Sequence, residues 1–185
     1  MSASTLSDPS QVPIVYFSKS ANRAHRFLSN FSANDFFLDG RWWPTVEHYY
    51  QAQKWKEPLR NSFSTRLPGE TPVHGLCPKK IKSMSGKTAT KNQKHMMVPI
   101  HEFDAVKLDV MRRALAAKFS FPGMRKKLLE TQLRPLRHFG RRPDYWDCHC
   151  DASGVITKGS NLHGQLMEEQ RAECLLQSMN EVVRR

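Results

Sequence analysis

Glu47, Gln51 and Lys54 recur at helical spacing within a stretch rich in aromatic residues. At about 100° per residue, they fall on one stripe of a helix. Tyr50 and Trp55 flank the stripe on either side, an arrangement that suits the floor of a cleft. An ionised glutamate in such a place can stabilise an oxocarbenium ion or activate water. The same spacing also fits an ordinary solvated helix face, and periodicity alone leaves both interpretations open.

Lys107 is a second candidate, because it stands in the middle of an apolar arc on a predicted helix. Phe103, Val110 and Met111 belong to this arc, and Lys118 shares it. Burial lowers the pKa of a lysine and makes its amine nucleophilic, so it could form a Schiff base with an opened sugar. Two alternatives remain open: an amine that reaches solvent, and a structural pair with a carboxylate.

A third candidate combines an aromatic pair with a carboxylate in the run Tyr145–Asp147. The rings could stack on a nucleobase, and the carboxylate could bind a ribose. Gly159 and Gly164 would let the backbone approach a ligand at the start of the last helix, where phosphate binds well. The alternative is a packed tryptophan with a capping aspartate. The run Cys148–Cys150 lacks the usual zinc spacing, so we expect no metal and no cofactor.

The elements that would position these residues follow from turn and capping signals. Asp39 and Gly40 predict a hairpin turn, and Thr45 is an acceptable N-cap for the helix that carries Glu47. We expect an α+β fold, compact and mostly helical, with a few short strands. The expected strands are Ile14–Phe17, Phe36–Leu38 and Arg41–Trp43, and the expected helices are 45–55, 103–119, 124–131 and 162–183. Residues 57–99 are predicted to be loops with one or two short helices, and residues 134–160 are predicted to be irregular.

Composition narrows the class of protein. The chain has 185 residues, 29 Lys and Arg against 17 Asp and Glu, and a formal net charge of +12. This length suits one domain, expected over residues 14–185, after a disordered segment at 1–13. The charge favours a polyanionic partner. The sequence lacks a signal peptide and a membrane-spanning run, and its four cysteines lack a disulfide spacing, so we expect a cytoplasmic or nuclear protein.

Several segments together resemble the NADAR domain family. The longest matching run is Trp43–Lys54, with the sequence WPTVEHYYQAQK. The other matching segments are Leu28–Phe31, Asp39–Gly40, Asp104–Lys107 with Met111, Lys118–Phe119, Leu128–Leu129 with Thr131, Tyr145–Trp146, and Gly159 with Asn161, Gly164, Leu166, Glu169 and Arg171. The resemblance covers residues 14–171, which is most of the chain.

The resemblance implies an N-glycosidase that cleaves the bond between a nitrogen and C1 of a ribose. Transferred by position, Glu47 would be the catalytic carboxylate, and Lys107, or less favourably Lys54, would capture the sugar covalently. Asp147 would be a further catalytic carboxylate if it replaces the family's aspartate after a shift of one residue; the alternative is that this carboxylate is absent. Phe103 stands where the family usually has tryptophan. The residues expected to bind substrate are Ser29, Asn30, Phe31, Trp43, Tyr50, Gln51, Lys54, Phe103, Met111, Trp146 and Asn161.

We therefore predict that the chain hydrolyses ADP-ribosylated guanine, either as a nucleoside or within single-stranded DNA or RNA, and releases ADP-ribose. One alternative is an N-glycosidase for phosphorylated intermediates of riboflavin biosynthesis. Another is a module that binds ADP-ribose or nucleic acid without turnover. No membrane partner is expected, and the sequence leaves the oligomeric state open.

Overall fold

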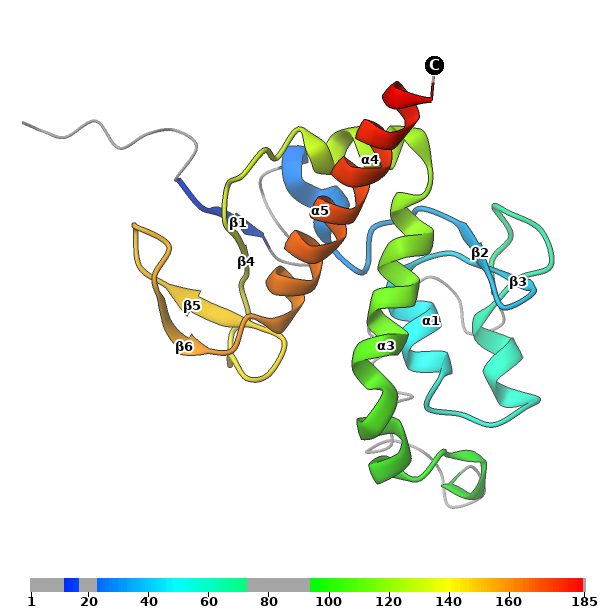
Figure 1. Ribbon diagram of the computed structural model, residues 1–185. Helices are drawn as coiled ribbons and strands as arrows, with labels where there is room; N and C mark the ends of the chain where they lie inside the picture. Colours follow the sequence, from blue (N-terminus) through cyan, green and yellow to red (C-terminus); the bar gives the residue numbers. More distant parts are fainter. Residues whose placement is uncertain (1–11, 17–22, 73–93, 185) are drawn as a thin grey trace, which may run out of the picture. The chain divides into compact units, whose positions relative to one another are not determined.

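The computed structural model describes residues 12–16, 23–72 and 94–184 (Figure 1). Its chain forms two compact units. The central unit is Asn30–Phe121, and the terminal unit combines Met1–Ser29 with Pro122–Arg185. The expected disordered segment lies almost wholly outside the described residues, as does most of the basic run within 79–94. Among the described residues, no helix has the length and apolarity needed to cross a bilayer.

The central unit begins with the expected hairpin. Strands β2 (Phe36–Leu38) and β3 (Arg41–Trp43) pair antiparallel, with Phe36 opposite Trp43. Asp39 and Gly40 form the turn at φ +52° and +74°, the left-handed conformation that a short hairpin turn requires. The Trp43 indole N–H donates to the Leu38 carbonyl over 2.8 Å, and the Trp43 ring meets Tyr49 edge-on.

Helix α1 (Val46–Ala52) follows directly. As predicted, Thr45 is the N-cap, and its hydroxyl accepts the His48 amide N–H over 3.2 Å. The helix ends at Ala52, three residues before the expected Trp55, because the chain continues in turns that bring Trp55 into a β-bridge with Met97. Within the described residues 57–72 and 94–99, the only helices are the short 3-10 segments η3 (Leu59–Phe63) and η4 (Lys94–Met96).

Helix α3 (Ile100–Phe119) packs against α1 and β2, and it begins three residues before the expected Phe103. Val110, Met111, Ala114 and Leu115 form its buried face, as the helical periodicity predicted. Val106 also falls on the predicted apolar arc, but it is 46% exposed. The buried face of α3 is therefore narrower at its N-terminal end than the sequence indicated.

The terminal unit contains strands in the region predicted to be irregular. β1 (Ile14–Tyr16) pairs in parallel with β4 (Leu136–His138), and β5 (Cys148–Cys150) pairs antiparallel with β6 (Ile156–Gly159). The prediction for residues 134–160 was therefore wrong, because each strand is only three or four residues long and β4 depends on a partner more than a hundred positions away. A further 3-10 helix, η2 (Arg23–Leu28), lies beside β1.

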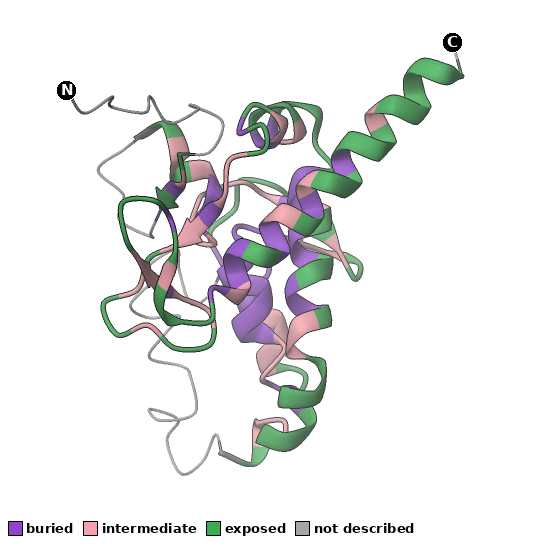
Figure 2. Ribbon diagram, turned by 60° about the vertical axis from the view of Figure 1, so that its left-hand side comes forward, coloured by how far each residue is buried: buried purple, intermediate pink, exposed green. Residues whose placement is uncertain are grey.

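Two α-helices complete the terminal unit. α4 (Pro122–Leu129) begins two residues before the helix expected over 124–131, because a proline is well suited to the first helical position. α5 (Leu162–Val183) has the predicted bounds and packs against β4 and α4 (Figure 1). Its buried residues lie mainly in its first half, and the second half is largely exposed (Figure 2).

Candidate active site

Glu47 is the buried carboxylate of the central unit. Its side chain is only 7% exposed, and its backbone N–H donates to the Asn30 carbonyl over 3.0 Å. Gln51, one turn further along α1, donates from Nε2 to the Glu47 Oε1 over 2.8 Å. This hydrogen bond fixes the Gln51 amide so that its own Oε1 faces away from Glu47. Among the described residues, nothing donates to that buried oxygen. The stripe predicted from periodicity is thus buried at Glu47 and Gln51 and half-buried at Lys54, and it is not a solvated face.

Lys54 lies beside this face at the end of α1. Its Nζ lies 5.0 Å from the centroid of the Tyr50 ring and 5.3 Å from that of Phe103, so two aromatic faces cover the ammonium group. Burial lowers the pKa of Lys54 below its ordinary value, and the negative charges of Glu47 and Asp104 partly oppose this effect. The aromatic pair itself is tight, because Tyr50 and Phe103 meet edge-on at 5.3 Å.

Lys107 differs from the expectation of a buried amine. Its side chain remains 23% exposed, and its Nζ pairs with the Asp104 Oδ1 over 3.0 Å, one turn earlier on α3. The alternative of a structural pair with a carboxylate is therefore the one observed. The deeply buried lysine of this helix is Lys118, which is 1% exposed. Burial lowers the pKa of Lys118 to about 7.

The central unit thus brings together two carboxylates, two amines, an amide and two aromatic rings from α1, the turn that follows it and α3. We call this group the Glu47 cluster, and it consists of Glu47, Tyr50, Gln51, Lys54, Phe103, Asp104 and Lys107. Asp104 belongs to a segment that resembles the family, but it was not predicted to be a site residue, although its spacing of three residues from Lys107 is a signal that could have identified it.

Four other predicted binding residues surround or support elements of the central unit. Asn30 donates from Nδ2 to the Met111 sulfur over 3.6 Å, and its carbonyl holds the Glu47 amide. Met111 and Trp43 are each 2% exposed and belong to the core. Phe31 is half-buried. Asn30 and Met111 therefore connect the start of α1 to the middle of α3.

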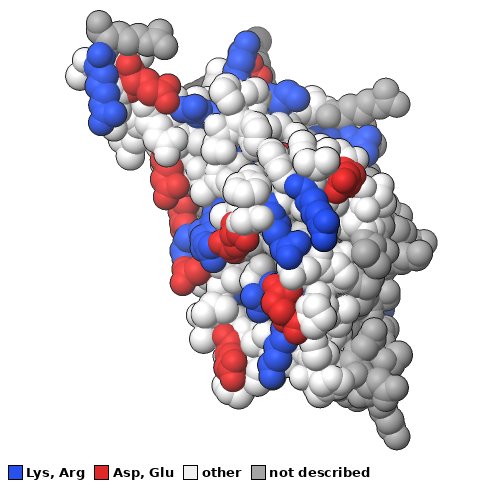
Figure 3. Space-filling model, turned by 90° about the vertical axis from the view of Figure 1, so that its right-hand side faces the viewer, with Lys and Arg blue, Asp and Glu red and all other residues white. Residues whose placement is uncertain are grey.

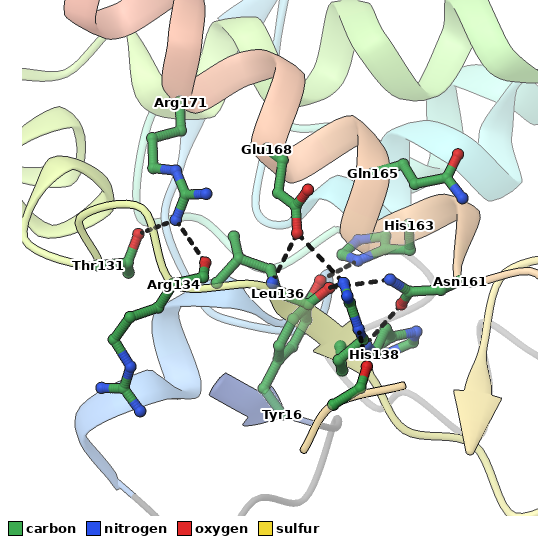
Figure 4. A network of polar contacts seen from close by, with 12 residues as sticks. Tyr16, Thr131, Arg134, Leu136, His138, Asn161, His163, Gln165, Glu168 and Arg171 are labelled. Carbon is green, nitrogen blue, oxygen red and sulfur yellow. Dashed lines mark hydrogen bonds and ion pairs between the residues drawn. The ribbon is translucent and has the colours of Figure 1, made fainter. Parts of the chain in front are cut away.

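The terminal unit holds a polar network that sequence reasoning missed (Figure 4). The buried Tyr16 hydroxyl lies 2.8 Å from the His163 Nδ1, and the rings of His138 and His163 are 4.6 Å apart. Burial, and after it the charge of Glu168, raises the pKa of Tyr16 well above its ordinary value. Asp147, predicted to be catalytic, places its Oδ1 2.6 Å from the His138 Nδ1. These residues are too far apart in sequence for periodicity to reveal their contact.

Asn161 is completely buried at the start of α5, with φ at +52°. Its Nδ2 donates to the Leu136 carbonyl and its Oδ1 accepts the His138 amide N–H, each over 2.9 Å (Figure 4). Both ends of the amide therefore hold β4 in place. The structure also explains the glycine at position 164, because a Cβ there would collide with the Leu136 carbonyl oxygen. The backbone that approaches Gly164 is therefore β4 of the same chain, and this corrects the expectation that the glycine makes room for a ligand.

Two other predicted binding residues, Trp146 and Ser29, belong to the terminal unit. Trp146 is half-buried and meets Tyr145 edge-on at 5.1 Å, and its backbone N–H donates to the Asp144 carboxylate. Ser29 is buried at the end of η2. Asp147, Trp146, Asn161 and Ser29 thus belong to the terminal unit, whereas the Glu47 cluster belongs to the central unit.

The described surface carries charges of both signs. On the face shown in Figure 3, Lys and Arg side chains alternate with Asp and Glu and do not form one continuous basic patch. A net charge of +12 therefore does not by itself locate a phosphate site. No group of three or more His, Cys, Asp or Glu side chains in the described part of the chain could hold a metal ion.

Comparison with known proteins places these features in a family. The NADAR domain matches residues 16–175. N-glycosidase YbiA of Escherichia coli strain K12 is 30% identical over 152 residues, covering 81% of this chain and 82% of that protein. The chloroplastic riboflavin biosynthesis protein PYRR of Zea mays is 30% identical over 134 residues, which are 72% of this chain but only 20% of the maize protein.

The NMR structure of the E. coli protein YbiA has the same fold. It aligns with a TM-score of 0.62 at 25% sequence identity, over 91% of each chain. This likeness confirms the expected α+β fold, in which helix is the main secondary structure. The chain therefore belongs to the NADAR domain family and is an N-glycosidase, a hydrolase of N-glycosyl bonds.

Proposed function

We propose that this N-glycosidase hydrolyses ADP-ribosylated guanine and releases ADP-ribose. The observation that carries the proposal is the Glu47 cluster, where a buried carboxylate lies near an amine whose pKa is lowered by burial. Cleavage at C1 of a ribose develops positive charge on the sugar ring, and an ionised carboxylate stabilises that charge. We assign this role to Glu47.

Gln51 supports a sugar substrate in two ways. Its hydrogen bond to the Glu47 Oε1 orients the carboxylate. Its own buried Oε1 accepts nothing from the described residues, and an acceptor in that state suits a ribose hydroxyl as its donor. The aromatic faces of Tyr50 and Phe103 add an apolar wall next to Lys54, which would exclude water from the reacting bond.

Lys54 is the better candidate for covalent capture of the sugar. A lysine attacks C1 only as the neutral amine, and burial lowers the pKa of Lys54, whereas Lys107 is held as an ion pair with Asp104. In this step the amine bonds to C1 and loses a proton as the bond from C1 to the base nitrogen breaks, and the base nitrogen takes up a proton. The bond from C1 to the ring oxygen then breaks, which gives the ring-opened imine. Water adds to C1, the bond from C1 to the amine breaks, and free ADP-ribose leaves.

The choice of ADP-ribosylated guanine over other N-ribosides rests on charge. A chain with a net charge of +12 suits a pyrophosphate or a nucleic acid better than a small monophosphate. The similarity to a protein named for riboflavin biosynthesis supports a second candidate, the phosphorylated ribosyl intermediates of that pathway. Both candidates use the same cluster and differ only in the groups attached to the ribose.

A direct assay separates these substrates. We expect the protein to cleave ADP-ribosylated guanosine to guanosine and ADP-ribose faster than it cleaves a phosphorylated riboflavin intermediate at the same concentration. Chromatography of the products measures both rates. Faster cleavage of the riboflavin intermediate would assign the second function. Binding of ADP-ribose without release from either substrate would identify a binding module and contradict the proposal.

Trapping with borohydride tests the covalent step. Reduction during turnover is expected to leave a ribose adduct on Lys54, located by peptide mass spectrometry. Lys54→Arg should abolish the adduct, whereas Lys107→Arg, which keeps the charge beside Asp104, should retain it. An adduct on Lys107 would return the role to the residue that the sequence indicated. The absence of any adduct during active turnover would instead favour direct attack by water.

A further inference from the structure

A row of aromatic and basic side chains crosses neighbouring segments of the terminal unit. Phe139 follows directly after β4, and its ring stacks on that of His149 in β5, with centroids 5.1 Å apart and planes inclined by 18°. Phe139 nevertheless remains 40% exposed. Lys158 of β6 is paired with His149 across the antiparallel strands, so both side chains project from the same face of the hairpin. Figure 1 shows β5 and β6 beside β4, which contacts β5.

Two arginines adjoin this row. The His149 Nε2 donates to the Gly140 carbonyl over 2.9 Å. Arg141 and Arg142 come next in the chain and therefore begin beside the stacked rings. Both arginines are exposed, and so is Lys158. We call this group the Phe139 surface, and it consists of Phe139, Arg141, Arg142, His149 and Lys158.

The cations of the Phe139 surface have no internal partner, whereas the carboxylates of the same segment do. Within the described part of the chain, neither arginine forms an ion pair, and Lys158 forms none. The three carboxylates between residues 139 and 160 are engaged internally. Asp144 accepts a backbone N–H, Asp147 pairs with a histidine, and Asp151 accepts the donors of its own turn. The groups left for an outside partner are therefore positive.

We propose that the Phe139 surface binds single-stranded nucleic acid. Exposed cations around an exposed ring fit a polymer in which phosphates alternate with bases, because the phosphates pair with the cations and an unpaired base stacks on the ring. In a duplex the bases stack on one another, so a single strand fits better. A free pyrophosphate or an acidic lipid surface would use the cations and leave the ring without a role.

The inference deepens the proposed function and rests on it for one point only, that the strand at this surface flanks a modified guanine. Binding of an unmodified strand needs no turnover, so it can be measured even if the proposed substrate is wrong. Conversely, cleavage of ADP-ribosylated guanosine needs no strand. The two proposals can therefore fail separately.

Fluorescence anisotropy with short labelled strands, oligothymidylate and oligouridylate, tests the binding. We expect saturable binding that weakens with salt, with a slope of log affinity against log salt of about −2, because each of three phosphate contacts contributes about −0.7. The strand that binds more tightly identifies DNA or RNA as the natural polymer. Binding of neither strand at low salt would overturn the proposal.

Substitutions separate the cations from the ring. Arg141→Gln and Lys158→Gln should each make the salt slope shallower by about 0.7. Phe139→Leu keeps an apolar side chain but loses the ring, so we expect binding about 5–100-fold weaker with the slope unchanged. Phe139→Tyr keeps a ring and should bind like the wild type. Lys126→Gln, at an exposed position on α4, removes the same charge elsewhere and should leave affinity and slope unchanged.

Turnover connects the surface to the substrate. Arg141→Gln and Phe139→Leu should raise KM for ADP-ribosylated guanine within a strand and leave KM for ADP-ribosylated guanosine unchanged. An equal effect of Lys126→Gln would show that only the overall charge matters. Unchanged binding by Phe139→Leu, together with equally tight binding to phosphatidylserine vesicles, would assign the cations to a general anion surface. Either result would contradict the proposal.

Discussion

Glu47→Gln is expected to abolish nearly all turnover of ADP-ribosylated guanosine, lowering kcat by about 10²–10⁴-fold. The amide keeps an oxygen that can accept the hydrogen bond from Gln51, so the buried face stays satisfied. It loses the negative charge that stabilises a positive sugar ring. Binding should change much less than turnover, because the ground-state sugar is neutral at C1. Initial rates of ADP-ribose release measure this directly.

The control for this variant is Glu102→Gln, which removes a carboxylate from the exposed first turn of α3. It changes the net charge equally and should keep wild-type kcat. If Glu47→Gln folds normally and releases ADP-ribose at the wild-type rate, Glu47 is not the catalytic carboxylate. The proposed chemistry of the Glu47 cluster would then be wrong, whatever the substrate.

Lys118→Met should stabilise the protein at and below neutral pH and remove much of the pH dependence of its stability. Lys118 is 1% exposed, and burial lowers the pKa of its amine from an ordinary 10.5 to about 7. The folded state therefore releases a proton that the unfolded chain still holds between these two values. In that range the free energy of unfolding of the wild type rises with pH. Below pH 7 the folded protein must hold a buried ammonium group.

Urea denaturation monitored by tryptophan fluorescence, at several pH values from 6 to 9.5, is the appropriate measurement. At pH 6 we expect Lys118→Met to gain about 2–4 kcal/mol over the wild type, a difference that shrinks as the pH rises. Lys126→Met, at an exposed position on α4, should leave the slope of the wild type unchanged. A wild-type stability that is flat across this range would contradict a lowered pKa for Lys118.

Local signals predicted much of the central unit. Asp39 and Gly40 fixed the hairpin turn because few residues tolerate a positive φ, and Thr45 fixed the start of α1 through its own hydroxyl. In the terminal unit, the bounds of α5 followed from an uninterrupted helical pattern. Such features depend on neighbours in the sequence, so a single chain contains enough information to locate them.

Features that depend on distant partners were missed. β4 is three residues long and exists because β1 pairs with it, a contact that no local pattern reports. The network of Tyr16, His138 and His163 is another case, since its members come from three separate segments. The apolar arc of α3 was read correctly as a buried face, but it could not show whether Lys107 or Lys118 was the buried amine. Exposure at the two ends of a helix depends on what packs there.

Asp39 has a consequence for how the central unit can open. Its carboxylate accepts the Tyr49 hydroxyl of α1 over 2.8 Å and also pairs with Arg113 of α3, while its backbone forms the hairpin turn. One side chain thus connects the β2–β3 hairpin to α1 and to α3, the two helices beside the reactive groups. Fraying of the hairpin should consequently loosen its contacts with α1 and with α3 together.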